Sequence, residues 1–116
     1  MENSVLKIYI SSTDKIGTGL LYELIVQKAK ENGISGATVY RGIMGYGPSS
    51  KHINSSKFWE LTEKLPIIIE LIDKTEAINN FYNLIEKDFV NLPKGCLITI
   101  QPIDIKLYKA GKPLAL

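Results

Sequence analysis

The sequence predicts an α+β domain: a ferredoxin-like βαββαβ sandwich in which an antiparallel sheet carries two helices on one face. Apolar segments of strand length and segments of helical period follow one another in that order along the chain. A chain of 116 residues is long enough for one domain with a real core, here residues 1–116. Its 45% hydrophobic residues and net charge of +2 exclude an intrinsically disordered protein.

The first strand and the first helix follow from a change of hydrophobic period. Apolar and polar side chains alternate over residues 5–10, which is typical of a strand. From Gly19 onward the apolar residues follow helical spacing, with Thr18 as the expected N-cap. Gly33 is the expected stop at the C-terminal end of this helix.

A second strand and a long loop are predicted for the middle of the chain. Residues 37–44 are rich in β-branched and aromatic side chains, which favour a strand. Residues 45–57 are polar, small or basic and have no sustained period. Loops of this length in compact domains usually carry function. One short helix is expected between Ser55 and Lys64.

The third strand and the second helix come next. Residues 65–72 form a nearly continuous apolar run of strand length. Pro66 stands at its start, and proline is tolerated at the first residue of a strand. Asp73 and Glu76 have the spacing of a capping box, and the apolar residues after them lie on one helical stripe. The helix is expected to end near Asn91.

The end of the chain predicts a fourth strand over residues 96–100 and a short extra C-terminal strand over 103–108. In the βαββαβ topology the third strand lies in the middle of the sheet. It is apolar on both faces, although helices cover only one of them. Self-association is therefore expected, because a symmetric oligomer hides the second face.

Composition narrows the classes of function. The lone Cys96 excludes internal disulfides and zinc sites built from several cysteines, which fits a reducing cytoplasm. We expect no signal peptide and no membrane span, because the apolar runs are only a few residues long. Lys and Arg are scattered along the chain without a basic stripe, so nucleic acid is not an expected partner.

The residues suited to catalysis are few. His52 is the only histidine, and a solvated loop residue is a better interpretation than a metal ligand or general base, since no second ligand accompanies it. Lys94 could lower the pKa of the Cys96 thiol, but a small buried residue is the better interpretation. We find no catalytic constellation and do not expect an enzyme.

Glycines and lysines suggest an anion site. Gly42, Gly45 and Gly47 cluster where the second strand enters the long loop. Glycine allows positive φ and close backbone approach, so this segment either binds an anion or only makes a tight exit from the sheet. Lys94 lies before the fourth strand, and Lys106 and Lys109 lie after it. Each of these lysines either contacts a phosphate group or is simply a solvated charge.

Three stretches resemble one family: LLYE from residue 20, GISGATVYRGIMGYG from residue 33 and LPIIIE from residue 65. They closely resemble the uncharacterised PII-like proteins of bacteria and archaea, domain of unknown function 190, over about residues 4–108. That family is similar in fold to the nitrogen regulatory PII signalling proteins. PII proteins are homotrimers that bind adenine nucleotides between neighbouring subunits and contact target proteins through a long flexible loop, the T-loop.

The resemblance also implies roles for individual residues. It makes residues 48–63 a flexible T-loop-like segment that would contact a partner through Ser49, Lys51, His52 and Lys57. Ligand-binding positions are implied at the base of this loop and in the loops before and after the last strand: Gly45, Tyr46, Gly47, Lys94, Gly95, Lys106 and Tyr108. Tyr108 stands where PII proteins have one of two arginines.

The expected function is that of a cytoplasmic, non-enzymatic, trimeric PII-like signalling protein. It would bind AMP, ADP or ATP or a related anion, with or without magnesium, in the cleft between subunits. No cofactor is obligatory, and the loop would contact a target protein, which could be a membrane protein. One alternative is a trimeric metal-binding protein of the divalent-cation tolerance type, which the scarcity of His and Cys disfavours. The other is a small-molecule enzyme of the ferredoxin-like monooxygenase kind, although no acid, base or cofactor motif supports it.

Overall fold

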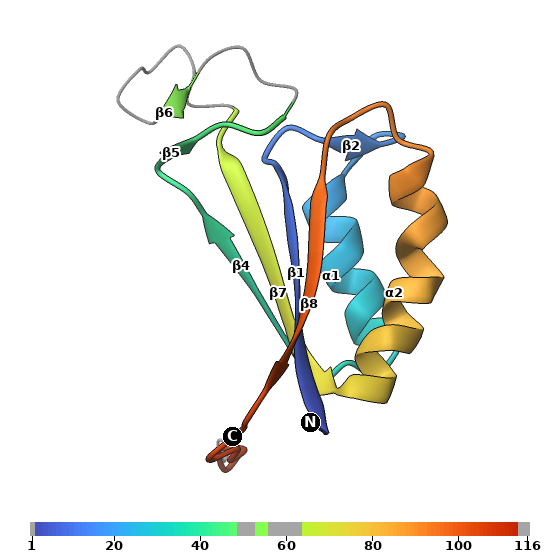
Figure 1. Cartoon of the computed structure of the whole chain (residues 1–116), viewed down its shortest axis with the longest axis vertical. Coiled ribbons are helices and arrows are strands. Elements are labelled where there is room, and N and C mark those ends of the chain that lie inside the picture. The colour runs from blue at the N-terminus through green and yellow to red at the C-terminus, as the bar shows by residue number, and fades with distance from the viewer. Residues whose placement is uncertain (1, 49–52, 56–63, 114–116) are drawn as a thin grey trace.

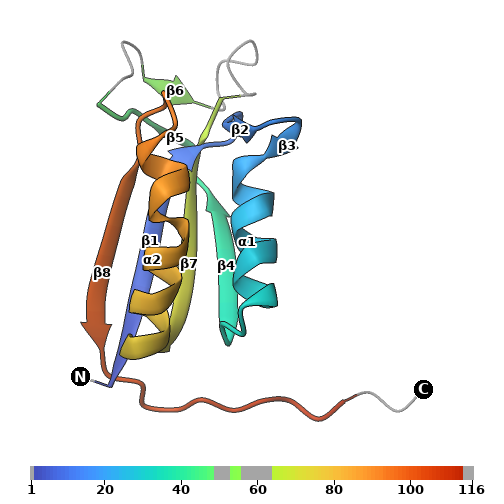
Figure 2. The same cartoon turned by 90° about the vertical axis from the view of Figure 1, so that its right-hand side faces the viewer.

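The computed structural model describes residues 2–48, 53–55 and 64–113. Its elements are β1 (Asn3–Ser11), β2 (Lys15–Ile16), β3 (Gly19–Leu20), α1 (Leu21–Glu31), β4 (Gly36–Arg41), β5 (Met44–Gly45), β6 (Asn54–Ser55), β7 (Pro66–Lys74), α2 (Thr75–Val90) and β8 (Leu97–Ile103). The main sheet has the order β4-β7-β1-β8, with every neighbouring pair antiparallel. Both helices lie on the same face of this sheet (Figures 1 and 2). The prediction of a ferredoxin-like α+β fold is confirmed.

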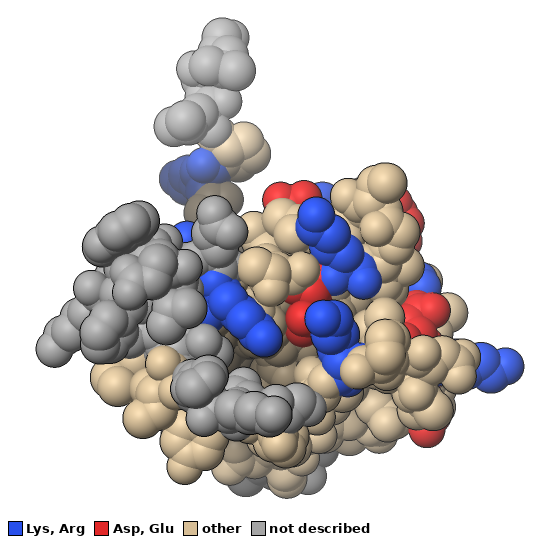
Figure 3. Space-filling model, turned by 90° about the horizontal axis from the view of Figure 1, so that it is seen from above, with Lys and Arg blue, Asp and Glu red and all other residues tan. Residues whose placement is uncertain are grey.

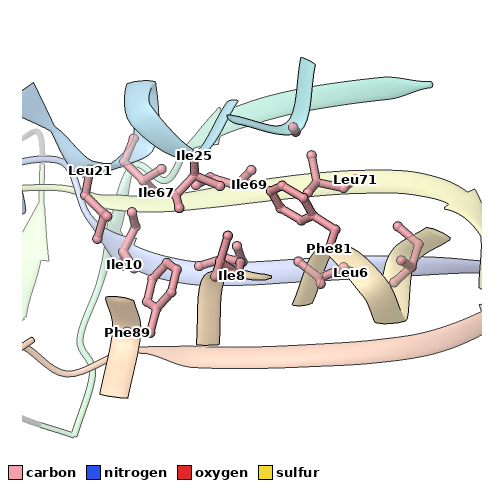
Figure 4. Packing of buried hydrophobic residues seen from close by; sticks show 13 residues of the cluster. Leu6, Ile8, Ile10, Leu21, Ile25, Ile67, Ile69, Leu71, Phe81 and Phe89 are labelled. Atoms are coloured by element: carbon pink, nitrogen blue, oxygen red, sulfur yellow. The ribbon is translucent and has the colours of Figure 1, made fainter. Parts of the chain in front are cut away.

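The core lies between the helices and the two central strands, β1 and β7. Alternate residues of these strands point toward the helices, and cross-strand pairing places Ile8 directly opposite Ile69. Both side chains are fully buried. Figure 4 shows how Ile25 of α1 and Phe81 of α2 approach this layer from the helix side. Other members of the same buried cluster are Leu6, Ile10, Leu21, Ala29, Ile67, Leu71, Ile78, Ile85 and Phe89.

The start of α1 differs from the prediction. Thr18 is not its N-cap, and the helix begins at Leu21 after Leu20, which makes no side-chain capping bond. Gly17 has a φ of 61°, which allows a tight turn between the short strands β2 and β3. The predicted stop at the other end is confirmed, since Gly33 has a φ of 77° just beyond the last helical turn.

The strand predicted over residues 37–44 is divided in two. β4 ends at Arg41, and after a break Met44 and Gly45 form β5, which pairs with Asn54 and Ser55 of β6. The long loop thus leaves the sheet through a short two-stranded ladder that the sequence pattern did not indicate. The helix expected between residues 55 and 64 falls mostly on residues 56–63, which lie outside the described residues.

Two predictions for the second half of the chain are wrong. Asp73 does not form a capping box, because β7 continues past it to Lys74. The Asp73 carboxylate instead accepts hydrogen bonds from the backbone N–H groups of Ser35 and Lys74, both within 2.9 Å. The separate strand over residues 103–108 is not present, because β8 runs without interruption to Ile103 and no strand follows it up to residue 113. Residues 104–113 have no regular secondary structure.

The face of the sheet opposite the helices carries its own apolar row. The register places Tyr40, Ile68, Tyr9 and Leu97 side by side across all four strands. Tyr40 and Leu97, on the two edge strands, are 47% and 54% exposed. The sequence-based expectation that the central strand is apolar on both faces is met in part, because β7 presents Ile68 and Ile72 on this face but also Glu70, which lies beside Lys7. We call this face the open face.

Candidate functional site

A pocket of about 420 Å³ opens at the end of the sheet where β1 ends and β7 begins. Its walls come from the segment that follows β4, the start of β7 and the connection between α2 and β8. Figure 3 views this end of the molecule and shows basic side chains gathered around a small acidic patch. The volume is in the range that holds small ligands. We call it the loop-base pocket.

Five of the residues expected to bind a ligand line this pocket: Gly45, Tyr46, Gly47, Lys94 and Gly95. They come from two segments nearly fifty positions apart in the sequence. Tyr46 is 73% exposed, so its ring is available to a ligand. Lys94 is also exposed and makes no ion pair with the described part of the chain. The two segments thus offer an aromatic surface and an exposed ammonium to one cavity.

The glycines of the loop base do not have the conformation that the sequence suggested. Among the described residues only Gly17 and Gly33 have positive φ, so Gly42, Gly45 and Gly47 do not form a left-handed anion-binding turn. Close packing is the reason for two of them. A Cβ on Gly42 would lie 2.7 Å from Cγ of Pro66, and one on Gly45 would lie 3.3 Å from it. These glycines let the chain pass over Pro66 as it leaves the sheet.

Two charged residues without an expected role also line the pocket, Asp14 and Lys64. Asp14 is 5% exposed. Its Oδ2 atom accepts a hydrogen bond of 2.9 Å from the backbone N–H of Ser11, and its carbonyl accepts one of 2.8 Å from Leu21. This carboxylate therefore holds the turn after β1 in place at the floor of the pocket. The polar run from Ser11 to Asp14 was the available signal, because such runs after a buried strand often form side-chain to backbone turns.

Cys96 lies half-buried in the same pocket. Burial raises the pKa of its thiol above the ordinary value, and the negative charge of Asp14 raises it further. The thiol is therefore neutral at pH 7. The interpretation in which Lys94 lowers the pKa of the thiol is therefore wrong, and Cys96 is a small residue of intermediate burial, less enclosed than the buried residue that the sequence suggested.

Lys106 and Tyr108 are not in the loop-base pocket. They line a second cavity of about 440 Å³ together with Lys74 and Asp73, near the opposite end of the sheet. The reason is geometric: β8 starts at Leu97 beside the loop-base pocket and carries the chain away from it to Ile103. Lys106 pairs with Asp104 across 2.6 Å between Nζ and Oδ2. Within one chain, these residues cannot share a ligand with Lys94.

The expected partner-contacting residues belong to the long loop between β5 and β7. Ser49, Lys51, His52 and Lys57 lie outside the described residues, so the partner-binding and flexible loop remains a prediction. Among the residues that the structure does describe, no three His, Cys, Asp or Glu side chains gather as a metal site. Over the same residues, no helix has the length and apolar character that crossing a membrane requires.

Comparison with known proteins identifies the family. The profile of DUF190, described as Uncharacterized ACR, COG1993, matches residues 3–105. The chain belongs to the DUF190 family. A UPF0166 protein of Aquifex aeolicus (strain VF5) is 31% identical over 105 residues, which cover 90% of this chain and 94% of that relative. The family resemblance read from the sequence is confirmed.

Solved structures confirm that this DUF190 chain has a PII-like fold. CPII, a nitrogen regulatory PII-like protein from Thiomonas intermedia K12, was solved bound to ADP, AMP and bicarbonate. It has a TM-score of 0.62 and 14% identity, over 87% of this chain and 85% of that chain. A protein of Thermus thermophilus classed as PII-like signaling has a TM-score of 0.57 and 18% identity, over 87% and 89% of the two chains.

Proposed function

We propose that this chain is a PII-like regulatory protein that binds an adenine nucleotide, or a related anion, in the loop-base pocket. Nucleotide occupancy would order the segment between β5 and β7, and this segment would contact a target protein. Such a switch requires that the partner bind the two states of the loop with different affinity. The protein acts by binding, without a chemical step of its own.

One observation carries the proposal: Tyr46 and Lys94 line the same cavity at the point where the long loop leaves the sheet. A phosphate chain beside the Lys94 ammonium would gain a charge-assisted contact, and an aromatic ring can cover a nucleobase. The fold supports the same assignment, because CPII, which shares it, was solved with ADP and AMP. Binding is proposed with or without magnesium.

The proposal includes a homotrimer. The open face exposes large apolar side chains on both edge strands, among them Tyr40 and Leu97. Exposed apolar area of this kind marks an interaction surface, and a closed symmetric oligomer buries it with copies of the same chain. Light scattering coupled to gel filtration at micromolar concentration is expected to give about three times the monomer mass.

Calorimetry with AMP, ADP and ATP, each with and without magnesium, tests the nucleotide site. We expect binding by the wild type and at least roughly tenfold weaker binding by Lys94→Ala, because a charge-assisted contact is worth about 1.5–3 kcal/mol. Lys87→Ala, which removes an exposed lysine of α2, is the matched control and should bind normally.

Two results would overturn parts of the proposal. Absence of binding heat with all three nucleotides at millimolar concentration would remove the nucleotide. Normal affinity in Lys94→Ala would keep the nucleotide but place it elsewhere. Incubation of the protein with ATP, followed by chromatography of the nucleotides, tests the absence of chemistry: we expect ATP to be recovered intact.

A further inference from the structure

Arg41 is the only arginine among the 14 basic residues of the chain. It ends β4, an edge strand in which every residue is exposed. Its guanidinium forms no ion pair with the described residues. Arginine differs from lysine in presenting a planar fork of donors that matches two oxygens of one phosphate. The chain thus places its only guanidinium, a group suited to bidentate contacts with an anion, at the corner of the sheet, where it has no ion pair to the described residues.

Arg41 does not line the loop-base pocket of its own chain. It pairs with Ile67, whose side chain belongs to the core, so the Arg41 side chain leaves the sheet on the helix side. Lys94 lies beside β8 at the other edge, with β7 and β1 between. Three strand spacings correspond to about 14 Å. In a single chain the Arg41 and Lys94 side chains therefore lie at the same end of the main sheet but at its two opposite edges.

A second copy of the chain can bring the two edges together. β4 and β8 are both edge strands, and they run antiparallel to each other because the sheet has an even number of antiparallel strands. Rotation about an axis along the strands therefore places β4 of one copy antiparallel to β8 of the next. Edge strands that avoid pairing are usually protected by charges or proline. Neither strand carries a charge apart from Arg41, and the one proline, Pro102, lies toward the end of β8 away from Leu97.

The backbone of β4 is ready for such pairing. The N–H of Gly42 donates to the carbonyl of Pro66 across 2.8 Å, so the backbone groups one and three residues earlier, at Arg41 and Val39, point away from β7. The register puts Arg41 level with Ile67 and Ile10, and Leu97 begins β8 opposite Tyr9. Arg41, the last residue of β4, and Leu97, the first residue of β8, therefore lie at the same end of the sheet.

We propose that Arg41 of one copy is an anion-binding residue of the loop-base pocket of the adjacent copy, across a contact between β4 and β8. There it would face Lys94 from the other side of a phosphate group and supply two parallel hydrogen bonds to it. The pocket of a single chain is then incomplete. This inference rests on the oligomer and the anion site of the proposed function, and it adds the residue that completes that site.

Complementation between two variants tests the inference. Arg41→Ala and Lys94→Ala are each expected to weaken ADP or ATP binding about tenfold or more, with the oligomer intact by light scattering. When the two variants are unfolded, mixed in equal amounts and refolded together, roughly one quarter of the sites should regain wild-type affinity, because a site needs Lys94 from one copy and Arg41 from the next. If no sites in the mixture regain wild-type affinity, the inference that Arg41 binds in the pocket of the adjacent copy is wrong.

Further variants separate the possible failures. Arg41→Lys keeps the charge and loses the fork, so its affinity should fall between those of Arg41→Ala and the wild type. Lys30→Ala on α1 is the control and should bind normally. A wild type that is monomeric or binds no adenine nucleotide overturns the proposed function and the inference together. A trimeric, nucleotide-binding wild type with normal affinity in Arg41→Ala overturns the inference alone.

The β4–β8 contact can be tested without a nucleotide. In Arg41→Cys the new thiol would lie near the native Cys96 of the next copy, just before β8. A short bis-maleimide should therefore join the chains into covalent dimers and trimers. The double variant Arg41→Cys/Cys96→Ser is the control and should stay uncrosslinked. Crosslinking that persists in the double variant, or none in Arg41→Cys, contradicts the proposed contact.

Discussion

The backbone N–H of Gly42 donates a hydrogen bond to the carbonyl of Pro66 across 2.8 Å, and the two residues are so close that a Cβ on Gly42 would lie 2.7 Å from Cγ of Pro66. This contact joins the last part of the β4 segment to the first residue of β7. It fixes the direction in which the chain leaves the sheet toward the loop-base pocket.

Gly42→Ala is therefore expected to destabilise the protein. The added methyl group meets the rigid ring of Pro66, and such overpacking costs about 1–3 kcal/mol of unfolding free energy. Gly36→Ala is the matched control, because it lies at the other end of β4 and a Cβ there meets nothing within 4 Å. Urea unfolding followed by circular dichroism measures both. Equal stability of the two variants would contradict the steric explanation.

Ile69 lies at the centre of the core and is fully buried between β1 and the helices. Ile69→Ala should lower the free energy of unfolding by about 2–5 kcal/mol, because it removes buried methyl groups and leaves a cavity. Val90, at the end of α2, is 73% exposed. Val90→Ala should change the unfolding free energy by less than about 0.5 kcal/mol. A small effect of Ile69→Ala would mean that the core can close around the missing atoms.

Leu97 tests the open face. It is 54% exposed on β8 and pairs with Tyr9 on that face. In a trimer that buries the open face, Leu97→Glu would place an unpaired carboxylate in the interface, so the oligomer should dissociate. Leu84→Glu on α2, at a position 47% exposed, is the control and should remain oligomeric. Light scattering distinguishes the two, and a trimeric Leu97→Glu would show that another surface forms the interface.

Asp14 should control the acidity of the Cys96 thiol. The charge of Asp14 adds to burial in raising the pKa of Cys96. Asp14→Asn removes that charge, so the pKa should fall toward its ordinary value without reaching it, because burial is the larger cause. A lower pKa gives more thiolate at any pH below it, so alkylation by iodoacetamide should become faster. Asp104→Asn, whose carboxylate pairs with Lys106 beyond the far end of β8, should leave the rate unchanged.

Local patterns predicted most elements because their signals lie within a few residues. Alternation over residues 5–10 marked β1, and the helical stripe after Glu76 marked α2. Gly33 marked the end of α1, since its left-handed conformation depends on the residue itself. These features follow from backbone sterics and hydrophobic period, which distant parts of the chain change little.

The errors at element ends have a different origin. Thr18 lost its expected capping role because Gly17 turns the chain and Leu20 pairs with Lys15. Asp73 does not have its expected capping role because β7 stays paired with β1 as far as Lys74. In each case hydrogen bonds to a neighbouring strand replaced a side-chain cap, and those neighbours are not visible in a local window.

The sequence by itself determined the βαββαβ order, the DUF190 family and the candidate residues at the loop base and at Lys94. Only the tertiary structure decided which of them meet. It brought Tyr46 and Lys94 to one pocket, added Asp14 to its floor and placed Lys106 at another cavity. The physical reason is that a strand carries its two ends apart by about 3.3 Å per residue, whereas residues distant in sequence meet wherever strands end side by side.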